Sequence, residues 1–285
     1  MIKTILIPTD FSENAHLAGK YAISMAQKTG AKIIFFHSYY VPIYAENIPI
    51  DPITEGNLKA DAFSELEQFK KENITAHSEI ASECIVRTGN AVESILSVAK
   101  ELNVDLIVMG TKGSSGISEV IFGSNTEDVL IKTEIPVLAI PEKALYKDLK
   151  KIVFATNYHF SDFQAIEDLI VLGNLFDFHI TVLHINDGEF NHEFEYSMLD
   201  NFRAKVKERS NYPNLYFQLI ENKNIYEGLQ TFIHQNDIDM IAVTSRKKAL
   251  YNRLFGRSIS KKMAFHTDIP LLVFKINQDD EITEF

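Results

Sequence analysis

The sequence predicts an α/β fold built from two tandem doubly wound domains, each with a five-stranded parallel sheet. Short β-branched and apolar runs alternate with longer stretches of helical period, which is the pattern of strands joined by helices. The runs are nearly continuous in apolar residues, as at 106–109, which is typical of parallel strands covered by helices on both faces. The whole order then occurs a second time, so each half is expected to form its own sheet.

Four matched segment pairs define the internal repeat. Two pairs are separated by 147 residues and two by 134, so the second copy is slightly shorter in its middle. The pairs are 3–10 with 150–157, 33–37 with 180–184, 105–109 with 239–243, and 135–140 with 269–274. A repeat of this length indicates a duplicated domain rather than a solenoid. We expect domains at 1–143 and 150–277, with the charged stretch 142–151 as linker.

The strands and helices of each half follow from these patterns. In the first half the expected strands are 4–8, 32–37, 78–86, 106–109 and 137–140, and the expected helices are 13–28, 57–72, 91–102 and 124–132. In the second half the expected strands are 152–155, 180–185, 215–220, 240–243 and 271–274. Doubly wound sheets bind ligands beyond the carboxyl ends of their strands, where the strand order reverses. The residues directly after the first and fourth strands are therefore the first candidates for a site.

Composition narrows the possible functions. A chain of 285 residues with 46% hydrophobic and 24% charged residues fits globular domains and excludes long disorder. The balance of 28 Lys and Arg against 39 Asp and Glu gives a net charge of −11, which disfavours nucleic acid and anionic lipid as partners. The single cysteine, Cys84, cannot form an intramolecular disulfide and is expected to be buried in a strand. The first apolar run is too short for a signal peptide and no run suits a membrane span, so we expect a cytoplasmic protein.

A segment rich in glycine and hydroxyl residues follows the fourth strand. Gly110, Gly113 and Gly116 precede Gly123 and Ser124, where an amphipathic helix is expected to begin. Glycines let backbone amides approach a bulky anion, hydroxyl groups donate to phosphate oxygens, and a helix N-terminus carries positive partial charge. The spacing is not that of a Walker A loop, a dinucleotide fingerprint or a nucleophile elbow. A polyphosphate is the ligand class that this segment favours.

The spacing G-x2-G-x9-G-S, together with residues 8–12 after the first strand, resembles the ATP-binding universal stress proteins, a family in which tandem copies also occur. The resemblance implies that Asp10 meets the ribose or adenine side, that Ser38 lies against adenine, and that the glycine segment wraps ribose and phosphates. The implied ligand is ATP, or else AMP or ADP, with Mg²⁺ as an optional companion. The implied binding residues are Pro8, Thr9, Asp10, Ser38, Met109, Gly110, Thr111, Lys112, Gly113, Gly123, Ser124, Asn125 and Thr126. The resemblance also implies a storage or sensing module, and no general base or other catalytic residue is evident.

Plainer interpretations stay open for several of these residues. Asp10 could form an Asx-turn, and Ser12 with Glu13 would cap the next helix in any protein. The glycines could simply form turns. His37 and its counterpart His184 are expected to be packed and hydrogen-bonded rather than metal ligands. The function could likewise be that of an interaction protein with a vestigial glycine loop, or of a slow ATPase.

The second copy departs from the glycine pattern. Depending on one gap, Gly110 aligns with Val243 or Thr244, so a side chain is expected to occupy the phosphate space there. Asn157 stands in place of Asp10. The second lost glycine is replaced by a residue of a basic cluster that could bind another anion, made of Arg246, Lys247, Lys248, Arg253 and Arg257. We therefore expect one nucleotide per chain, bound by the first half.

The sequence also predicts how the two halves pair and which acidic stretches face solvent. Unpaired strand edges present free backbone donors and acceptors, so the last strands, 137–140 and 271–274, are expected to pair as an internal pseudo-dimer. A homodimer of whole chains stays open. The acidic stretches 187–195 and 279–284 are expected to be solvated surface.

Overall fold

Two compact units divide the chain, Ile2–Glu142 and Lys143–Phe285. The computed structural model describes residues 2–41, 52–74, 79–111, 123–245 and 267–275. Residues 141–150 contain no helix or strand, and the first strand of the second unit begins at Lys151. The charged stretch between the two repeats is therefore the connection between the two units.

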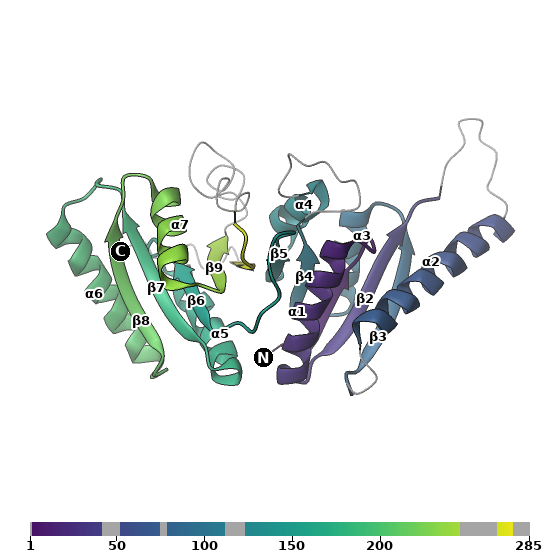
Figure 1. The fold of residues 1–285 in the computed structure, drawn as a ribbon, viewed down its shortest axis with the longest axis horizontal. Helices are drawn as coiled ribbons and strands as arrows, with labels where there is room; N and C mark the ends of the chain where they lie inside the picture. Colours follow the sequence, from purple (N-terminus) through teal and green to yellow (C-terminus); the bar gives the residue numbers. More distant parts are fainter. Residues whose placement is uncertain (1, 42–51, 75–78, 112–122, 246–266, 276–285) are drawn as a thin grey trace. The chain divides into compact units, whose positions relative to one another are not determined.

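The first unit is a doubly wound sheet of five parallel strands in the order β3-β2-β1-β4-β5 (Figure 1). Its elements are β1 (Thr4–Pro8), α1 (Glu13–Thr29), β2 (Lys32–Tyr39), α2 (Pro52–Asn73), β3 (Ser82–Thr88), α3 (Ala91–Glu101), β4 (Leu106–Gly110), α4 (Ser124–Lys132) and β5 (Val137–Ile140). Helix α1 lies beside α2, and α3 lies beside α4. The strand order reverses between β1 and β4, which puts the switch point where ligands bind in such sheets.

The second unit repeats this topology with the order β10-β9-β6-β7-β8, again all parallel. Its described elements are β6 (Lys151–Ala155), α5 (Ser161–Phe176), β7 (His179–Asn186), α6 (His192–Arg209), β8 (Leu215–Glu221), α7 (Ile225–Asn236), β9 (Met240–Ser245) and β10 (Leu271–Lys275). The predicted fold class, two tandem five-stranded α/β domains, is confirmed.

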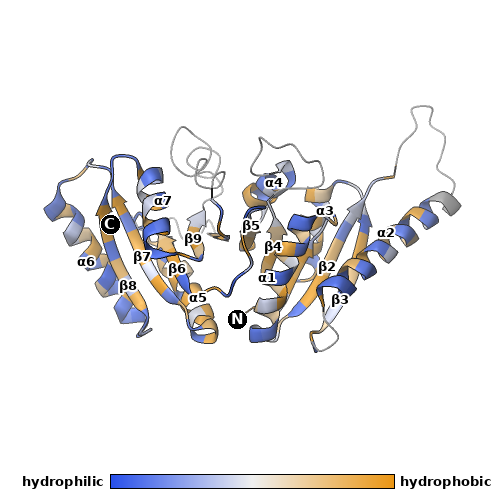
Figure 2. Cartoon of the chain, in the orientation of Figure 1, coloured by the Kyte–Doolittle hydropathy of each residue, from blue (hydrophilic) through white to orange (hydrophobic). Residues whose placement is uncertain are grey.

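The core of each unit is made by the strands, which are the most apolar elements in Figure 2. In the central strand β1, Ile5, Leu6 and Ile7 are fully buried, and Phe154 of β6 is fully buried in the second unit. Such strands need helices on both faces, as the sequence pattern predicts. Among the described helices, none combines the length and apolar character that crossing a membrane requires.

An aspartate carboxylate fixes the start of the central strand in both units; Asp239 is buried and Asp105 is half-buried. Asp105 Oδ2 accepts hydrogen bonds from the backbone amides of Lys3 (2.7 Å) and Thr4 (2.9 Å). Asp239 Oδ2 does the same for the amides of Lys150 (2.9 Å) and Lys151 (2.7 Å). The two aspartates are 134 residues apart, so the sequence repeat extends to a shared side-chain contact.

Two predicted boundaries in the first unit are wrong by several residues. Strand β3 begins at Ser82 rather than at residue 78 and runs to Thr88. It is an edge strand whose residues are only partly buried, so its apolar pattern marks its ends poorly. Helix α2 begins at Pro52 rather than at residue 57. Proline suits the first helical position, where its missing N–H is not needed, whereas Gly56 makes the sequence pattern of this helix start late.

Candidate functional site

The carboxyl edge of the first sheet brings most of the predicted site residues to one place. Because β1, β2 and β4 are parallel neighbours, the segments that follow them emerge at the same edge. The start of α4 reaches this edge too, since Thr126 and Gly123 bond to the end of β4. Two predicted residues, Lys112 and Gly113, lie outside the described residues.

Burial separates the residues that could touch a ligand with a side chain from those that could not. Met109 and Pro8 are buried in the sheet, so only their main chain is available at the edge. The buried hydroxyl residues are Thr9, Thr111 and Thr126. Asp10, Ser38 and Gly123 are half-buried, whereas Ser124 and Asn125 are exposed.

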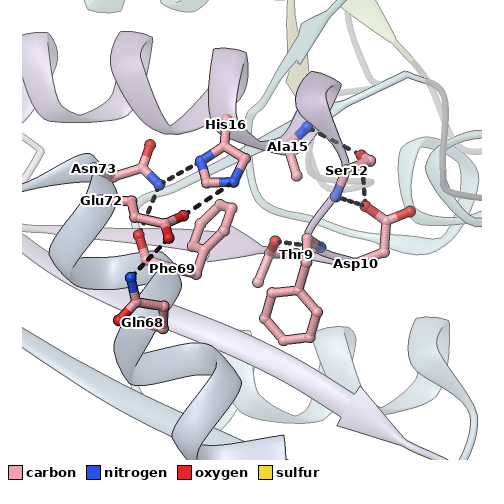
Figure 3. A network of polar contacts seen from close by, with 10 residues as sticks. Thr9, Asp10, Ser12, Ala15, His16, Gln68, Phe69, Glu72 and Asn73 are labelled. Atoms are coloured by element: carbon pink, nitrogen blue, oxygen red, sulfur yellow. Dashed lines mark hydrogen bonds and ion pairs between the residues drawn. The ribbon is translucent and has the colours of Figure 1, made fainter.

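The turn after β1 is held by its own side chains (Figure 3). Thr9 Oγ1 accepts a hydrogen bond from the amide of Phe11 (2.9 Å), whose φ of 64° is left-handed. Asp10 Oδ1 accepts from the amide of Ser12 (3.2 Å) and from its hydroxyl (2.7 Å). The Ser12 hydroxyl oxygen in turn accepts from the amide of Ala15 (3.2 Å) and caps α1. The Asx-turn and the helix cap are therefore both present, and they hold the Asp10 carboxylate at the edge of the sheet.

His37 supports this turn from the neighbouring strand. Its Nδ1 lies 2.7 Å from the backbone oxygen of Thr9, and its ring packs against Phe11 with centroids 4.4 Å apart. In the second unit, His184 Nδ1 lies 2.8 Å from the oxygen of Thr156. The prediction of packed, hydrogen-bonded histidines is confirmed in both units.

Gly110 is required by the packing of α1 on β4. A Cβ at this position would lie 2.6 Å from Asn14 Oδ1 and 3.1 Å from the backbone carbon of Asn14. Asn14 is buried, and its Nδ2 donates to the oxygen of Ile140 at the end of β5 (3.0 Å). The missing side chain of Gly110 thus faces the start of α1. Sequence reasoning missed Asn14, although a polar residue in the first turn of a sheet-packed helix was a usable signal.

The start of α4 is bonded to the end of β4. Thr126 Oγ1 donates to the oxygen of Gly110 (2.8 Å), and the amide of Gly123 donates to the oxygen of Thr111 (2.5 Å). The amide of Thr111 donates to the oxygen of Ile140 (2.9 Å). Gly123 is the N-cap of α4 and provides no side-chain acceptor for the first amides of the helix. These amides and the positive end of the helix dipole form an environment suited to an anion.

The second unit holds the corresponding helix and strand, α5 and β9, together by a different contact. Gly110 pairs with Ile140 and Thr244 pairs with Phe274, so the strand register makes Thr244 the counterpart of Gly110. The Thr244 hydroxyl donates to Asp162 Oδ1 (2.6 Å), and Asp162 is 2% exposed. This contact turns the Thr244 hydroxyl toward α5, and the expectation that a side chain here occupies phosphate space stays a prediction. The basic cluster after β9 lies outside the described residues.

Asp162 is a buried carboxyl group with several donors around it. The Thr156 hydroxyl donates to Oδ2 (2.6 Å), as does the amide of His159 (3.2 Å). Burial raises the pKa of Asp162 to about 6, and the hydrogen bonds from Thr156 and Thr244 only partly oppose this effect. This carboxyl group joins β6, α5 and β9 where the first unit uses Asn14.

One surface prediction for the second unit is also wrong. Residues 187–194 are exposed, but Glu195 on α6 is 5% exposed. Its Oε2 lies 3.3 Å from His184 Nε2. The helical repeat turns this acidic residue inward, where the histidine provides its partner. Residues 279–284 lie outside the described residues.

Known proteins resemble this chain in sequence and fold. Residues 1–141 match the model of the universal stress protein family. A universal stress protein of Thermus aquaticus is 31% identical over 141 residues, which cover 49% of this chain and 99% of that protein. Another, from Methanocaldococcus jannaschii, is 28% identical over 159 residues, which cover 50% of this chain and 97% of that protein. The crystal structure of a universal stress protein from Archaeoglobus fulgidus matches with a TM-score of 0.74 and 18% identity, over 95% of this chain and 98% of that one, so the fold is shared.

Proposed function

Because the chain belongs to the universal stress protein family, we propose that its first unit binds an adenine nucleotide, with ATP as the leading candidate. The protein then acts as a cytoplasmic sensing or regulatory module of the stress response. The single observation that carries the proposal is the N-terminus of α4, bonded to the end of β4 within the glycine motif. A phosphate group there would accept hydrogen bonds from the uncapped amides.

Thr111 adds a second polar group at the same place. It is 1% exposed, and its hydroxyl has no hydrogen-bond partner among the described residues. Leaving a buried hydroxyl unpaired costs roughly 1 to 3 kcal/mol, so a ligand atom or water bonded there would be favourable. Ser245 has a similarly unpaired hydroxyl at the equivalent position of the second unit, so this feature does not distinguish the units.

Asp10 is the residue that distinguishes the first unit from the second. In the first unit its carboxylate is held beside the carboxyl end of β1 and offers a charged acceptor for a ribose hydroxyl. In the second unit the neutral Asn157 stands at this position. Hydrogen bonds to charged groups are worth roughly 1.5 to 3 kcal/mol, so the second unit is expected to hold the nucleoside more weakly. We propose one nucleotide per chain, with Mg²⁺ as an optional companion that offsets phosphate charge.

Two other functions remain as alternatives. An interaction protein that binds no nucleotide would retain the glycine motif only as scaffold. A slow ATPase would use the same site and would need a general base aimed at the terminal phosphate, and the sequence pattern indicates none. We therefore propose a binding module without catalytic residues.

Isothermal calorimetry of the whole chain with ATP, ADP and AMP tests the proposal. We expect a stoichiometry of one, and Gly113→Val should weaken ATP binding at least tenfold because the side chain blocks the approach of phosphate. Gly56→Val is the control, since a Cβ at Gly56 meets nothing within 4 Å and the residue lies on the exposed face of α2.

Each result has a distinct reading. Wild-type protein that binds none of the three nucleotides supports the interaction-protein alternative. Equal ATP affinity in Gly113→Val and wild type contradicts the placement of the phosphates. Mass spectrometry of small molecules released from purified, denatured protein would identify a ligand that is retained through purification.

A further inference from the structure

We propose that Thr126 and Asn14 are positioning residues of the nucleotide site, which act on the phosphates through the backbone that they hold. The inference rests on the proposed function of this site. The sequence resemblance implies that Thr126 flanks the phosphates. The structure assigns its hydroxyl to another partner, so its contribution to binding is indirect.

Thr126 fixes the start of α4 relative to β4. Its side chain is 3% exposed, and its hydroxyl donates to the oxygen of Gly110 (2.8 Å). One turn earlier, the amide of Gly123 donates to the oxygen of Thr111 (2.5 Å). Together these two bonds set both the distance and the direction of the helix N-terminus at the edge of the sheet. Because backbone amides bind phosphate only when they point at it, this orientation determines how well the helix N-terminus serves as an anion site.

Asn14 fixes the other side of the same backbone. Its side-chain amide donates to the oxygen of Ile140 (3.0 Å), which also accepts from the amide of Thr111 (2.9 Å). A Cβ at Gly110 would lie only 2.6 Å from Asn14 Oδ1. Asn14 therefore holds the ends of β4 and β5 in register with the start of α1. The buried side chains of Asn14 and Thr126 therefore hold the two ends of the glycine motif, at Gly110 and just after Ser124.

The second unit shows that the first helix and the fourth strand of the domain can be joined without the Asn14–Gly110 contact. There Asp162 and Thr244 form a direct hydrogen bond of 2.6 Å between α5 and β9, which are the counterparts of α1 and β4. The fold thus accepts either solution. In the first unit, which has the complete glycine motif, Asn14 packs against Gly110, so β4 contributes no side-chain atom to this contact.

Calorimetry with ATP and with adenosine, on the full chain, tests the positioning role. Thr126→Val removes the hydroxyl and keeps the shape, so we expect ATP affinity to fall about tenfold while adenosine affinity is unchanged. Thr126→Ser retains the donor and should restore ATP binding. The matched control is Thr133→Val: Thr133 is also 3% exposed and lies at the opposite end of α4, where its hydroxyl oxygen accepts from the amide of Ile135.

Asn14→Ala provides a second variant should Thr126→Val fail to fold, and it should show the same selective loss of ATP affinity. Thermal unfolding of each variant is measured in parallel. A Thr126→Val protein that binds ATP as tightly as wild type overturns the inference. Equal weakening of ATP and adenosine also overturns it, because that result indicates a merely structural role. Wild-type protein that binds no nucleotide instead refutes the proposed function itself, so the two failures can be told apart.

Discussion

Gly110→Ala is predicted to destabilise the first unit because of a collision with α1. The added Cβ would lie 2.6 Å from Oδ1, 2.8 Å from Cγ and 3.1 Å from the backbone carbon of Asn14. The side chain of Asn14 can move only by giving up its bond to Ile140, and the backbone carbon can move only with α1. The glycine is thus required by helix packing, independently of any ligand.

The expected cost of Gly110→Ala follows from these contacts. Overpacking a buried site costs roughly 1 to 3 kcal/mol, and loss of the Asn14 hydrogen bond adds roughly 0.5 to 1.5 kcal/mol if the side chain swings away. We expect a decrease of about 2 kcal/mol in the unfolding free energy of the first unit. Asn14→Ala removes two of the three close contacts, so the double variant should be less destabilised than the sum of the single variants.

Amide hydrogen exchange read by mass spectrometry suits this test, because a two-unit chain need not unfold in one step. Peptides from β1 and β4 should lose protection in Gly110→Ala, while peptides from β6 and β9 act as an internal control. Gly56→Ala is a matched variant with open space around the added Cβ. Unchanged protection of β1 and β4 in Gly110→Ala would refute the packing argument, and additive effects in the double variant would refute the role of Asn14.

Three further predictions concern other groups. Burial raises the pKa of Asp162 from 3.8 to about 6, so the second unit should lose about 3 kcal/mol of unfolding free energy as pH rises from about 4 to about 7. In urea unfolding at several pH values, Asp162→Asn should reduce the loss of stability between pH 4 and 7 by about this amount, and a slope equal to that of wild type would contradict the prediction. Burial, with Glu67 nearby, raises the pKa of Cys84 to about 12, so iodoacetamide at pH 8 should modify the native thiol at least about a hundredfold more slowly than the thiol in urea. The internal pairing of the last strands stays a prediction: a disulfide between Ala139→Cys and Val273→Cys within one chain would support it, and its absence under oxidising conditions would count against it.

Much of the fold was available from the sequence because its signals are local or repeated. Strand β1 and helix α4 have the predicted boundaries, since a buried parallel strand and an amphipathic helix each show their pattern within a few residues. The repeat indicated a second unit even though Gly110 and Asp10 are replaced there by Thr244 and Asn157. The Asx-turn at Asp10 and the cap at Ser12 are also local, and the structure contains both.

Only the tertiary structure showed which side chains Gly110 and its counterpart Thr244 contact. The sequence could suggest that Gly110 admits phosphate, but its neighbour Asn14 is 96 positions away and reaches Ile140, 126 positions along the chain. The contact between Thr244 and Asp162 spans 82 positions, and it gives the residue in place of Gly110 a role in packing β9 against α5. Local patterns report which residues form a strand or a helix. Which side chains face each other across two elements depends on packing, and packing exists only after the chain has folded.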